Sequence, residues 1–474
     1  MIRLARYGAR VAAVGAAMFV GLLLVAPQAL FSSGNPIDAR LGGRLQELGF
    51  SGRIESTLGA RLGRPPDPRL ANVGRLLWFD TITGLNDDNT CAGCHSPTNG
   101  FGDSQPIAIG IESNGIVGPE RAGPRNMRRA PMVLNNAFFP ALMWNSRFRS
   151  LSGDPFDNSA GFLFPPPEGE SLSAEPHLLV AQAFIPPTER TEVAGFAFAG
   201  DNDAIRAEVA RRLDRVPAYR RLFGEIFASV RGGAPIDYEM FARAIAEFEF
   251  SLTFADAPID RYARGDRRAL TESEKRGALL FLGKAGCVEC HAVSGASNEM
   301  FTDFREHAIA VPQLVPENTN NQFDGPDANQ DFGLEDATAS PSDRYRFRTP
   351  SLRNVAVEAA FMHDGAFTTL AEAIRHHLDA AASLLAYNPA SQDLPPDLAG
   401  PIAPTVPLLA ALDPRLRTPI ELTPAEFHDL LAFVRDALLD RRADPDRLRR
   451  FVPGHLPSGN PTLTFQFNHA RRDR

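Results

Sequence analysis

The chain has 474 residues, of which 44% are hydrophobic and 22% charged, and its formal net charge at pH 7 is −8. This length and composition are typical of a globular protein with more than one core, and they exclude a chain that is disordered throughout. The negative charge argues against a nucleic-acid-binding protein, and the chain contains no nucleic-acid-binding motif.

The N-terminus has the pattern of an export signal. Three arginines in the first ten residues precede an apolar run from residue 11 to residue 31, and a positive start followed by a hydrophobic segment is typical of export. The run is close to the length that spans a bilayer, and Pro27 weakens the cleavage-site pattern near Ala29. We therefore expect residues 1–33 to be a cleaved signal or an inner-membrane anchor, with the rest of the protein in the periplasm.

All four cysteines lie in two copies of one pentad, Cys91-Ala-Gly-Cys94-His95 and Cys287-Val-Glu-Cys290-His291. This pentad is the attachment signature of c-type haem, in which two thiols form thioethers to the porphyrin and the histidine ligates iron. A zinc site built from both CxxC pairs would leave the two histidines without a role. A disulfide framework is not needed in a chain of this length. We expect two covalently bound c-type haems.

A weak repeat precedes the pentads. Gly74-Arg-Leu-Leu-Trp78-Phe79 stands before the first, and Gly277-Ala-Leu-Leu-Phe281-Leu282 stands before the second. The repeat predicts two related haem domains, with Trp78 in the core of the first. Between the two copies, apolar residues at helical spacing predict a helix over residues 236–248 that closes the first domain.

These features predict a mainly α fold of two cytochrome c-like haem domains in tandem. Segments rich in proline and glycine predict long loops, and the alternation typical of a strand is confined to residues 462–467. We expect the N-terminal haem domain at residues 40–255 and the C-terminal haem domain at residues 256–442. Residues 443–474 are expected to form a surface extension.

Several runs resemble the bacterial di-haem cytochrome c peroxidase and MauG family. Its C-terminal signature is matched by Phe347-Arg-Thr-Pro-Ser-Leu-Arg-Asn354, Phe361-Met-His-Asp-Gly365 and Thr369-Leu-Ala-Glu-Ala373, and its first half by Gly100-Phe-Gly-Asp103 and Pro131-Met-Val-Leu-Asn135. The resemblance spans residues 74–438. It implies that the haem of His95 binds peroxide and that the haem of His291 stores or passes electrons.

Gln182, Pro186 and Glu192 reproduce the family's distal trio at the family's spacing. The resemblance implies that Glu192 is the acid/base, because the proton of peroxide must be taken up and returned to the leaving oxygen. A carboxyl group in a dry pocket has a raised pKa and can serve in both directions. The alternative is that Glu192 and Glu189 are surface acids of a polar turn.

Two further positions bear on the haems by resemblance. Trp144 takes the place of the tryptophan that relays electrons between the haems, with plain packing as the alternative. Ile111 takes the place of a histidine that caps the reactive haem in many of these peroxidases, and no histidine lies between His95 and His177. Isoleucine cannot ligate iron, so we expect the reactive haem to be open in the ferric protein.

The family places the sixth ligand of the second haem on the helix after the Met-His-Asp-Gly segment, as methionine in many peroxidases and tyrosine in MauG. Counting from Gly365, that position is His377. Imidazole donates more strongly than a thioether, so a bis-histidine haem should have the lower potential. Met362 and His376 stay open as alternatives, since adjacent helix residues face about 100° apart. Otherwise we expect His376 on the surface and Met362 in the core.

Family members also hold calcium between the domains, with an asparagine side chain and two backbone carbonyls. Arg129 stands at the place of the asparagine, and Glu358 and Ala360 stand at the carbonyl places. An arginine repels a cation, which argues against calcium, and we expect a buried Arg129–Glu358 ion pair instead. Asn126 is the alternative ligand if the alignment shifts.

The expected activity is that of a periplasmic di-haem peroxidase. It would reduce hydrogen peroxide to water with electrons from a small redox protein, a cytochrome c or a cupredoxin. A MauG-like oxidase, which uses peroxide to oxidise a protein or an organic substrate, is the close alternative. A di-haem electron-transfer cytochrome is the alternative of another class, and the distal trio argues against it. The sequence leaves monomer and homodimer open.

Overall fold

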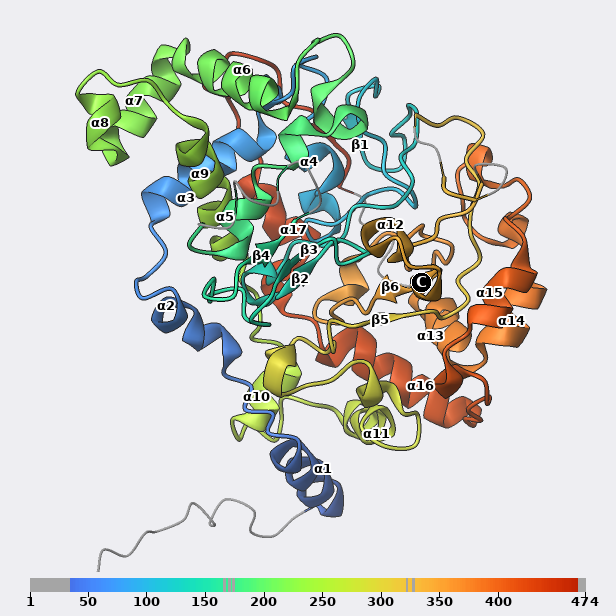
Figure 1. The fold of residues 1–474 in the computed structure, drawn as a ribbon. Helices are drawn as coiled ribbons and strands as arrows, with labels where there is room; N and C mark the ends of the chain where they lie inside the picture. The colour runs from blue at the N-terminus through green and yellow to red at the C-terminus, as the bar shows by residue number, and fades with distance from the viewer. Residues whose placement is uncertain are drawn as a thin grey trace, which may run out of the picture. The chain divides into compact units, whose positions relative to one another are not determined.

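The fold is organised around two pairs of crossing helices, one pair in each half of the chain (Figure 1). The computed structural model describes residues 35–164, 168, 172, 175–320, 323–325 and 329–467, so the predicted signal or anchor lies outside the described residues. In the first half α3 (Pro68–Phe79) packs on α9 (Tyr238–Ser251), and in the second half α11 (Glu272–Phe281) packs on α16 (Pro424–Ala432). None of the helices in the described part of the chain is long and apolar enough to cross a membrane.

The other elements are short. The remaining α-helices are α1 (Pro36–Glu47), α2 (Leu58–Arg61), α4 (Cys91–Cys94), α5 (Leu178–Gln182), α6 (Asn202–Asp214), α7 (Pro217–Ile226), α8 (Ala228–Arg231), α10 (Pro258–Ala263), α12 (Glu335–Thr338), α13 (Leu370–Leu378), α14 (Ala380–Ala386), α15 (Thr405–Ala411) and α17 (Pro445–Leu448). Among the described residues the strands form three small sheets: β1 (Ile116–Val117) parallel to β7 (Thr464–Phe465), the antiparallel β2 (Ala141–Leu142), β3 (Phe148–Ser150) and β4 (Phe162–Leu163), and the antiparallel β5 (Glu306–His307) and β6 (Phe347–Arg348). The expectation of a mainly helical protein is confirmed.

Local sequence signals explain where the main helices begin. The side chain of Asp67 accepts hydrogen bonds from the backbone N–H groups of the first turn of α3, and Pro68 takes the first helical position, where its missing N–H is not needed. At α11, Thr271 and Glu274 form a reciprocal capping box. The helix predicted over residues 236–248 is α9, which begins after its N-cap, Asp237.

The glycine of the sequence repeat has the same role in both halves. A Cβ atom on Gly74 would lie 1.8 Å from the carbonyl oxygen of Ala244 in α9, and one on Gly277 would lie 1.9 Å from the carbonyl oxygen of Asp429 in α16. No side chain fits at such distances, so only glycine lets the two helices of each pair cross so closely. The repeated sequence therefore corresponds to a repeated helix crossing.

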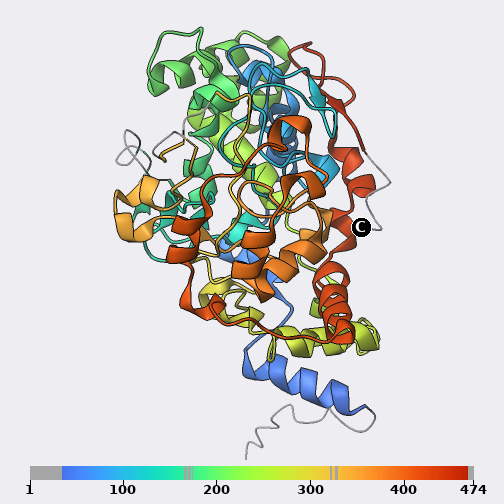
Figure 2. The same ribbon diagram turned by 90° about the vertical axis from the view of Figure 1, so that its right-hand side faces the viewer.

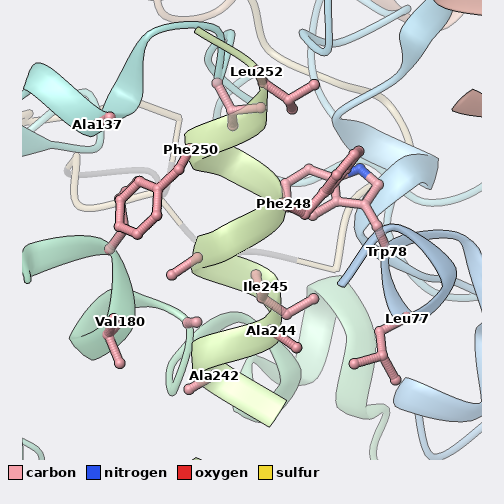
Figure 3. Close-up of a cluster of buried hydrophobic side chains, with 14 of the residues drawn as sticks. Leu77, Trp78, Ala137, Val180, Ala242, Ala244, Ile245, Phe248, Phe250 and Leu252 are labelled. Carbon is pink, nitrogen blue, oxygen red and sulfur yellow. The ribbon is translucent and has the colours of Figure 1, made fainter. Parts of the chain in front are cut away.

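Three aromatic rings recur beside each pentad histidine. In the first half the ring centres of Trp78, Phe101 and Phe248 lie 5.5, 5.8 and 6.3 Å apart. The second-half rings, with centres 5.3, 6.0 and 6.5 Å apart, are those of Phe281, Phe301 and Phe433. Figure 3 shows Phe248 pointing from α9 toward Trp78, which is buried as expected, whereas Phe250 points to the opposite side. Edge contacts of this kind each contribute about 0.5–1.5 kcal/mol beyond burial.

Each end of the described chain completes the core of the opposite half (Figure 2). At the start, α1 packs on α11 and Phe50 contacts Phe301 with ring centres 5.6 Å apart, although the boundary predicted at residue 40 groups this segment with the first half. At the other end, Phe451 contacts Phe101 and Phe248 at 5.6 and 5.9 Å. Since β7 also pairs with β1, the segment predicted as a surface extension supplies side chains to the first core.

Candidate functional site

The first pentad and the predicted distal residues line one cavity of about 360 Å³. The distal residues come from a short run of chain: α5 ends at Gln182, a 3₁₀ turn begins at Pro186, and a π-helical turn over Arg190–Ala194 carries the glutamate. The predicted site residues that the structure brings together here are Cys91, Cys94, His95, Gln182, Pro186 and Glu192. The cavity therefore places a carboxyl group and a haem-attachment motif in one space.

Both pentad histidines are prepared in the same way for metal binding. Nδ1 of His95 lies 2.9 Å from the carbonyl oxygen of Pro131, and Nδ1 of His291 lies 2.9 Å from that of Phe301. Burial lowers the pKa of each imidazole to about 4, so both rings are neutral and Nδ1–H donates to the carbonyl. This arrangement leaves Nε2 of each ring to ligate a metal ion.

Asn89 ties the first pentad to the loop that carries Glu192. Its side-chain nitrogen donates to the carbonyl oxygen of Glu192 at 2.8 Å, and its side-chain oxygen accepts from Arg121 at 3.0 Å. A Cβ atom on Gly93 would lie 1.9 Å from that same oxygen of Asn89. The glycine inside the pentad thus lets the distal loop approach the attachment residues.

The carboxyl group of Glu192 has the electrostatic properties of an acid/base. Burial raises the pKa of Glu192 to about 7, repulsion from Glu189 adds to the rise, and Arg147 opposes it. Glu189 lies farther out and accepts a hydrogen bond from Nη2 of Arg147 at 3.1 Å. With a pKa near neutrality both protonation states are populated, which proton transfer in two directions requires.

In the part of the chain that the structure describes, His95 is the only histidine that lines the first cavity. Ile111 is buried, its N–H donates to the carbonyl oxygen of Thr191 at 3.2 Å, and it does not line the cavity. The lining does include the thioethers of Met127 and Met143.

The second pentad lines another cavity, of about 250 Å³, together with His377. The ring centres of His291 and His377 lie 6.2 Å apart. Two imidazoles on opposite sides of one metal ion, each with a metal–nitrogen distance of about 2 Å, would have centres about 6 Å apart. Nδ1 of His377 lies 2.8 Å from the carbonyl oxygen of Ala373, which leaves its Nε2 for the metal. The pair therefore fits the two axial positions of one iron.

The expectation that His376 lies on the surface is wrong. Its side chain is fully buried because α14 packs against α13 on that side. Nδ1 of His376 lies 3.0 Å from Oγ of Ser383, and Nε2 lies 2.8 Å from the carbonyl oxygen of Ile309, so both ring nitrogens are engaged. Met362 lines the second cavity and is the alternative ligand that the structure leaves within reach.

The donor atoms fit haem better than zinc. All four cysteines are free thiols, and they divide between the two cavities. They do not gather into the four-thiolate site that zinc would use. Each cavity instead combines two cysteines with the histidine of the same pentad, whose Nε2 is free, and this is the donor set that a c-type haem uses.

Arg129 and Glu358 form the predicted buried ion pair, with Nη2 and Oε2 2.6 Å apart. Burial raises the pKa of Glu358 to about 7, and Arg129 opposes the rise. The carbonyl oxygen of Arg129 accepts a hydrogen bond from Nε1 of Trp144 at 2.9 Å, so the pair is linked to the predicted relay residue. Asn126, the alternative calcium ligand, lines the first cavity, and its buried side-chain oxygen has no hydrogen-bond partner.

Trp144 lines both cavities. Three polar residues that were not predicted from the sequence also line one or both of them. Glu249 lines the first cavity, His363 the second, and Arg348 both. Arg348 and His363 lie within the family's signature runs, which was a usable signal. Glu249 lies on the apolar helix α9 and had no such signal, although burial raises the pKa of its carboxyl group to about 8.

Comparison with known proteins agrees with this geometry. A family model for the di-haem cytochrome c peroxidases matches residues 68–268. The methylamine utilization protein MauG of Methylorubrum extorquens is 31% identical over 317 residues, 66% of this chain and 70% of that protein. The cytochrome-c peroxidase IdrP1 of Pseudomonas sp. strain SCT is 31% identical over 316 residues, 64% of this chain and 70% of that protein.

Among solved structures, that of a MauG-like protein associated with microbial copper homeostasis aligns with a TM-score of 0.55 and 26% identity, covering 80% of this chain and 92% of that one. The chain therefore belongs to the di-haem cytochrome c peroxidase family, which includes MauG, and is an oxidoreductase that carries two c-type haems.

Proposed function

We propose that this protein is a peroxidase that reduces hydrogen peroxide to water in the first cavity, with electrons that enter through the second. The observation that carries the proposal is the position of Glu192, whose pKa is about 7, in the same cavity as the His95 ligand. Haems joined by thioethers to the cysteines of each pentad supply the redox chemistry when bound, with His95 and His291 as their proximal ligands.

The distal residues of the first cavity manage the protons. Glu192 accepts a proton from one peroxide oxygen and returns it to the other, so the leaving oxygen departs as water. The amide of Gln182 donates a hydrogen bond to the substrate, and Pro186 keeps the turn between them rigid. Two electrons and two further protons complete the reduction of one peroxide to two water molecules.

Trp144 carries the electrons between the two cavities. It lines both of them, and its indole N–H is held by the carbonyl oxygen of Arg129 at 2.9 Å. His377 would hold the haem on the electron-storing side together with His291, and the ring separation of 6.2 Å between the two histidines supports this role. Two imidazole ligands would give this haem a low potential.

We expect the haem held by His95 to be open in the ferric protein, because His95 is the only histidine that lines the first cavity among the described residues. Low-temperature electron paramagnetic resonance of the ferric protein should give one high-spin signal and one low-spin bis-histidine signal. Two low-spin signals would contradict the open site. A histidine–methionine signature beside a bis-histidine signature would point to Met127 or Met143 as the cap.

Turnover distinguishes the peroxidase from its alternatives. The purified holoprotein should consume hydrogen peroxide when a reduced cytochrome c or cupredoxin is supplied, with two donor molecules oxidised per peroxide. A MauG-like oxidase is the second candidate. It is favoured by the first cavity having no histidine other than His95 in the described part of the chain, and by the His291–His377 pair. It would respond spectrally to peroxide and oxidise an added protein or organic substrate without turning over the donor. An electron-transfer cytochrome would show no spectral change with peroxide.

We also propose that the protein works in the periplasm, delivered there by residues 1–33. Cell fractionation should recover it in the periplasmic extract if the segment is cleaved and in the membrane fraction if it stays as an anchor. Covalent attachment through Cys91, Cys94, Cys287 and Cys290 predicts that both haems stay with the protein in acidified acetone.

A further inference from the structure

Trp144 and Arg348 are the two residues, among those described, that line both cavities. The proposed electron path accounts for Trp144 but not for Arg348. Arg348 is only 3% exposed, and its backbone N–H donates to the carbonyl oxygen of Trp144 at 2.6 Å. Arg348 is therefore held against the relay residue, in the wall that the two cavities share.

The guanidinium group of Arg348 is a buried charge without a carboxylate partner in the described residues. Nε donates to the carbonyl oxygen of Met143 at 2.8 Å and Nη1 to that of Thr349 at 3.4 Å, while Nη2 has no acceptor among these residues. Burial lowers the pKa of Arg348 to about 10 and the cross-strand neighbour Glu306 opposes this, so the group is charged at neutral pH.

Except for Arg121, which donates to backbone carbonyls and to the side-chain oxygen of Asn89, the other buried arginines in the described part of the chain have a carboxylate in contact. Arg353, which is fully buried, makes two 2.8 Å hydrogen bonds to Asp260, and Arg129 pairs with Glu358 at 2.6 Å. An unpaired buried charge is strongly unfavourable, and a guanidinium group prefers a carboxylate that it can bind with two N–H groups. Arg348 thus lacks a partner that a bound molecule with carboxylates would supply.

We propose that Arg348 is a positioning residue that binds haem propionate carboxylates at the wall shared by the two cavities. A c-type haem carries its propionates on the edge away from its thioethers. In the second cavity a cation already lies beside the attachment cysteines, because Nη1 of Arg415 is 3.7 Å from Sγ of Cys290. The same nitrogen is 3.2 Å from Nδ1 of His307. Arg348 lies instead on the wall toward the first cavity. It is therefore the cation that is available to the propionates.

This role has an electrochemical consequence. A fixed positive charge beside a haem favours the reduced iron, which carries one positive charge less than the ferric iron, and so raises the reduction potential. Because Arg348 lines both cavities, removal of its charge should lower the potentials of both haems. The inference rests on the two haems of the proposed function.

The test uses holoprotein variants in which the charge is removed or kept. Arg348→Gln keeps a donor for the Met143 carbonyl but loses the charge, and Arg348→Lys keeps the charge. The matched control is Arg346→Gln, which removes a neighbouring arginine whose side chain is 49% exposed. Haem content is measured first and the potential of each haem second, by spectroelectrochemical titration. A wild-type protein without two haems would refute the proposed function rather than this inference.

With two haems present, Arg348→Gln should lower both potentials, Arg348→Lys should restore most of the loss, and Arg346→Gln should leave both unchanged. An unmoved potential of either haem in Arg348→Gln, or an equal shift in the control, would overturn the inference. If Arg348→Gln does not fold, resonance Raman spectra of Arg348→Lys test whether the side chain binds the propionates. The propionate bending bands should shift when a planar fork is replaced by a point charge, and unchanged bands would overturn the assignment.

Discussion

Replacement of Glu192 by glutamine keeps the size of the side chain and removes the carboxyl group that takes the proton of peroxide. We expect the reaction of the ferric protein with hydrogen peroxide to slow by about 10²–10⁴-fold, the contribution typical of a positioned acid–base group. In the activation barrier this corresponds to about 3–5 kcal/mol. Because Glu192 lines the cavity without bearing on the helix pairs, the variant should fold and bind both haems.

The raised pKa of Glu192 also gives the pH dependence. Burial and Glu189 raise this pKa to about 7, and the form that accepts a proton is the carboxylate, so the wild-type rate should rise with pH through neutrality. The carboxyl group is half ionised at its pKa and about one tenth ionised one pH unit below, so the rate at pH 6 should be about one fifth of the rate at pH 7. Glutamine does not titrate, and the rate of the variant should be flat over this range.

Stopped-flow absorbance after mixing with hydrogen peroxide measures both effects. The matched control is Glu189→Gln. Glu189 lines the same cavity, and its replacement removes the repulsion that helps to raise the pKa of Glu192. The control should keep the plateau rate, with its midpoint moved to lower pH. If Glu192→Gln retained the wild-type rate, or its rise with pH, the acid/base role would be refuted.

Three further predictions concern ligation, packing and the ion pair. His377→Ala removes one of two imidazoles 6.2 Å apart, so the low-spin signal of the second haem should disappear from the ferric spectrum, and its persistence would point to another ligand. Gly74→Ala places a Cβ atom 1.8 Å from a carbonyl oxygen of α9 and should destabilise the holoprotein by about 1–3 kcal/mol in thermal unfolding. The control is Gly43→Ala, whose Cβ would meet no neighbouring atom within 4 Å and which should leave the stability unchanged. Because Arg129 and Glu358 form an ion pair, a calcium chelator should leave the spectrum and turnover unchanged, and tightly bound stoichiometric calcium would contradict this reading.

The features that could be predicted from the sequence are those whose chemistry requires a fixed spacing or a paired change. The first pentad predicts that Cys91, Cys94 and His95 lie together, because two thioethers and one iron ligand must reach the same porphyrin, and the three residues line one cavity. The Arg129–Glu358 pair could be predicted because a cation at a metal-ligand position needs a compensating anion nearby. The glycine repeat predicts two related halves, and each half has one close helix crossing at the repeated glycine.

The features that could not be predicted depend on which surfaces meet in three dimensions. Whether His376 or His377 faces the second cavity follows from α14, which covers one side of α13 and which nothing in the motif specifies. The place of Arg348 in both cavities likewise follows from β6 lying against the Trp144 segment. Periodicity describes one helix at a time, and these positions are set by neighbours distant in the chain.

The exchange of chain ends between the halves bears on the order of events during synthesis and folding. Phe451, which completes the ring cluster of the first core, is made after both pentads, while Phe50 is made early and must wait for Phe301. Neither ring cluster is complete until most of the chain has been synthesised. The two cores therefore depend on segments from opposite ends of the described chain.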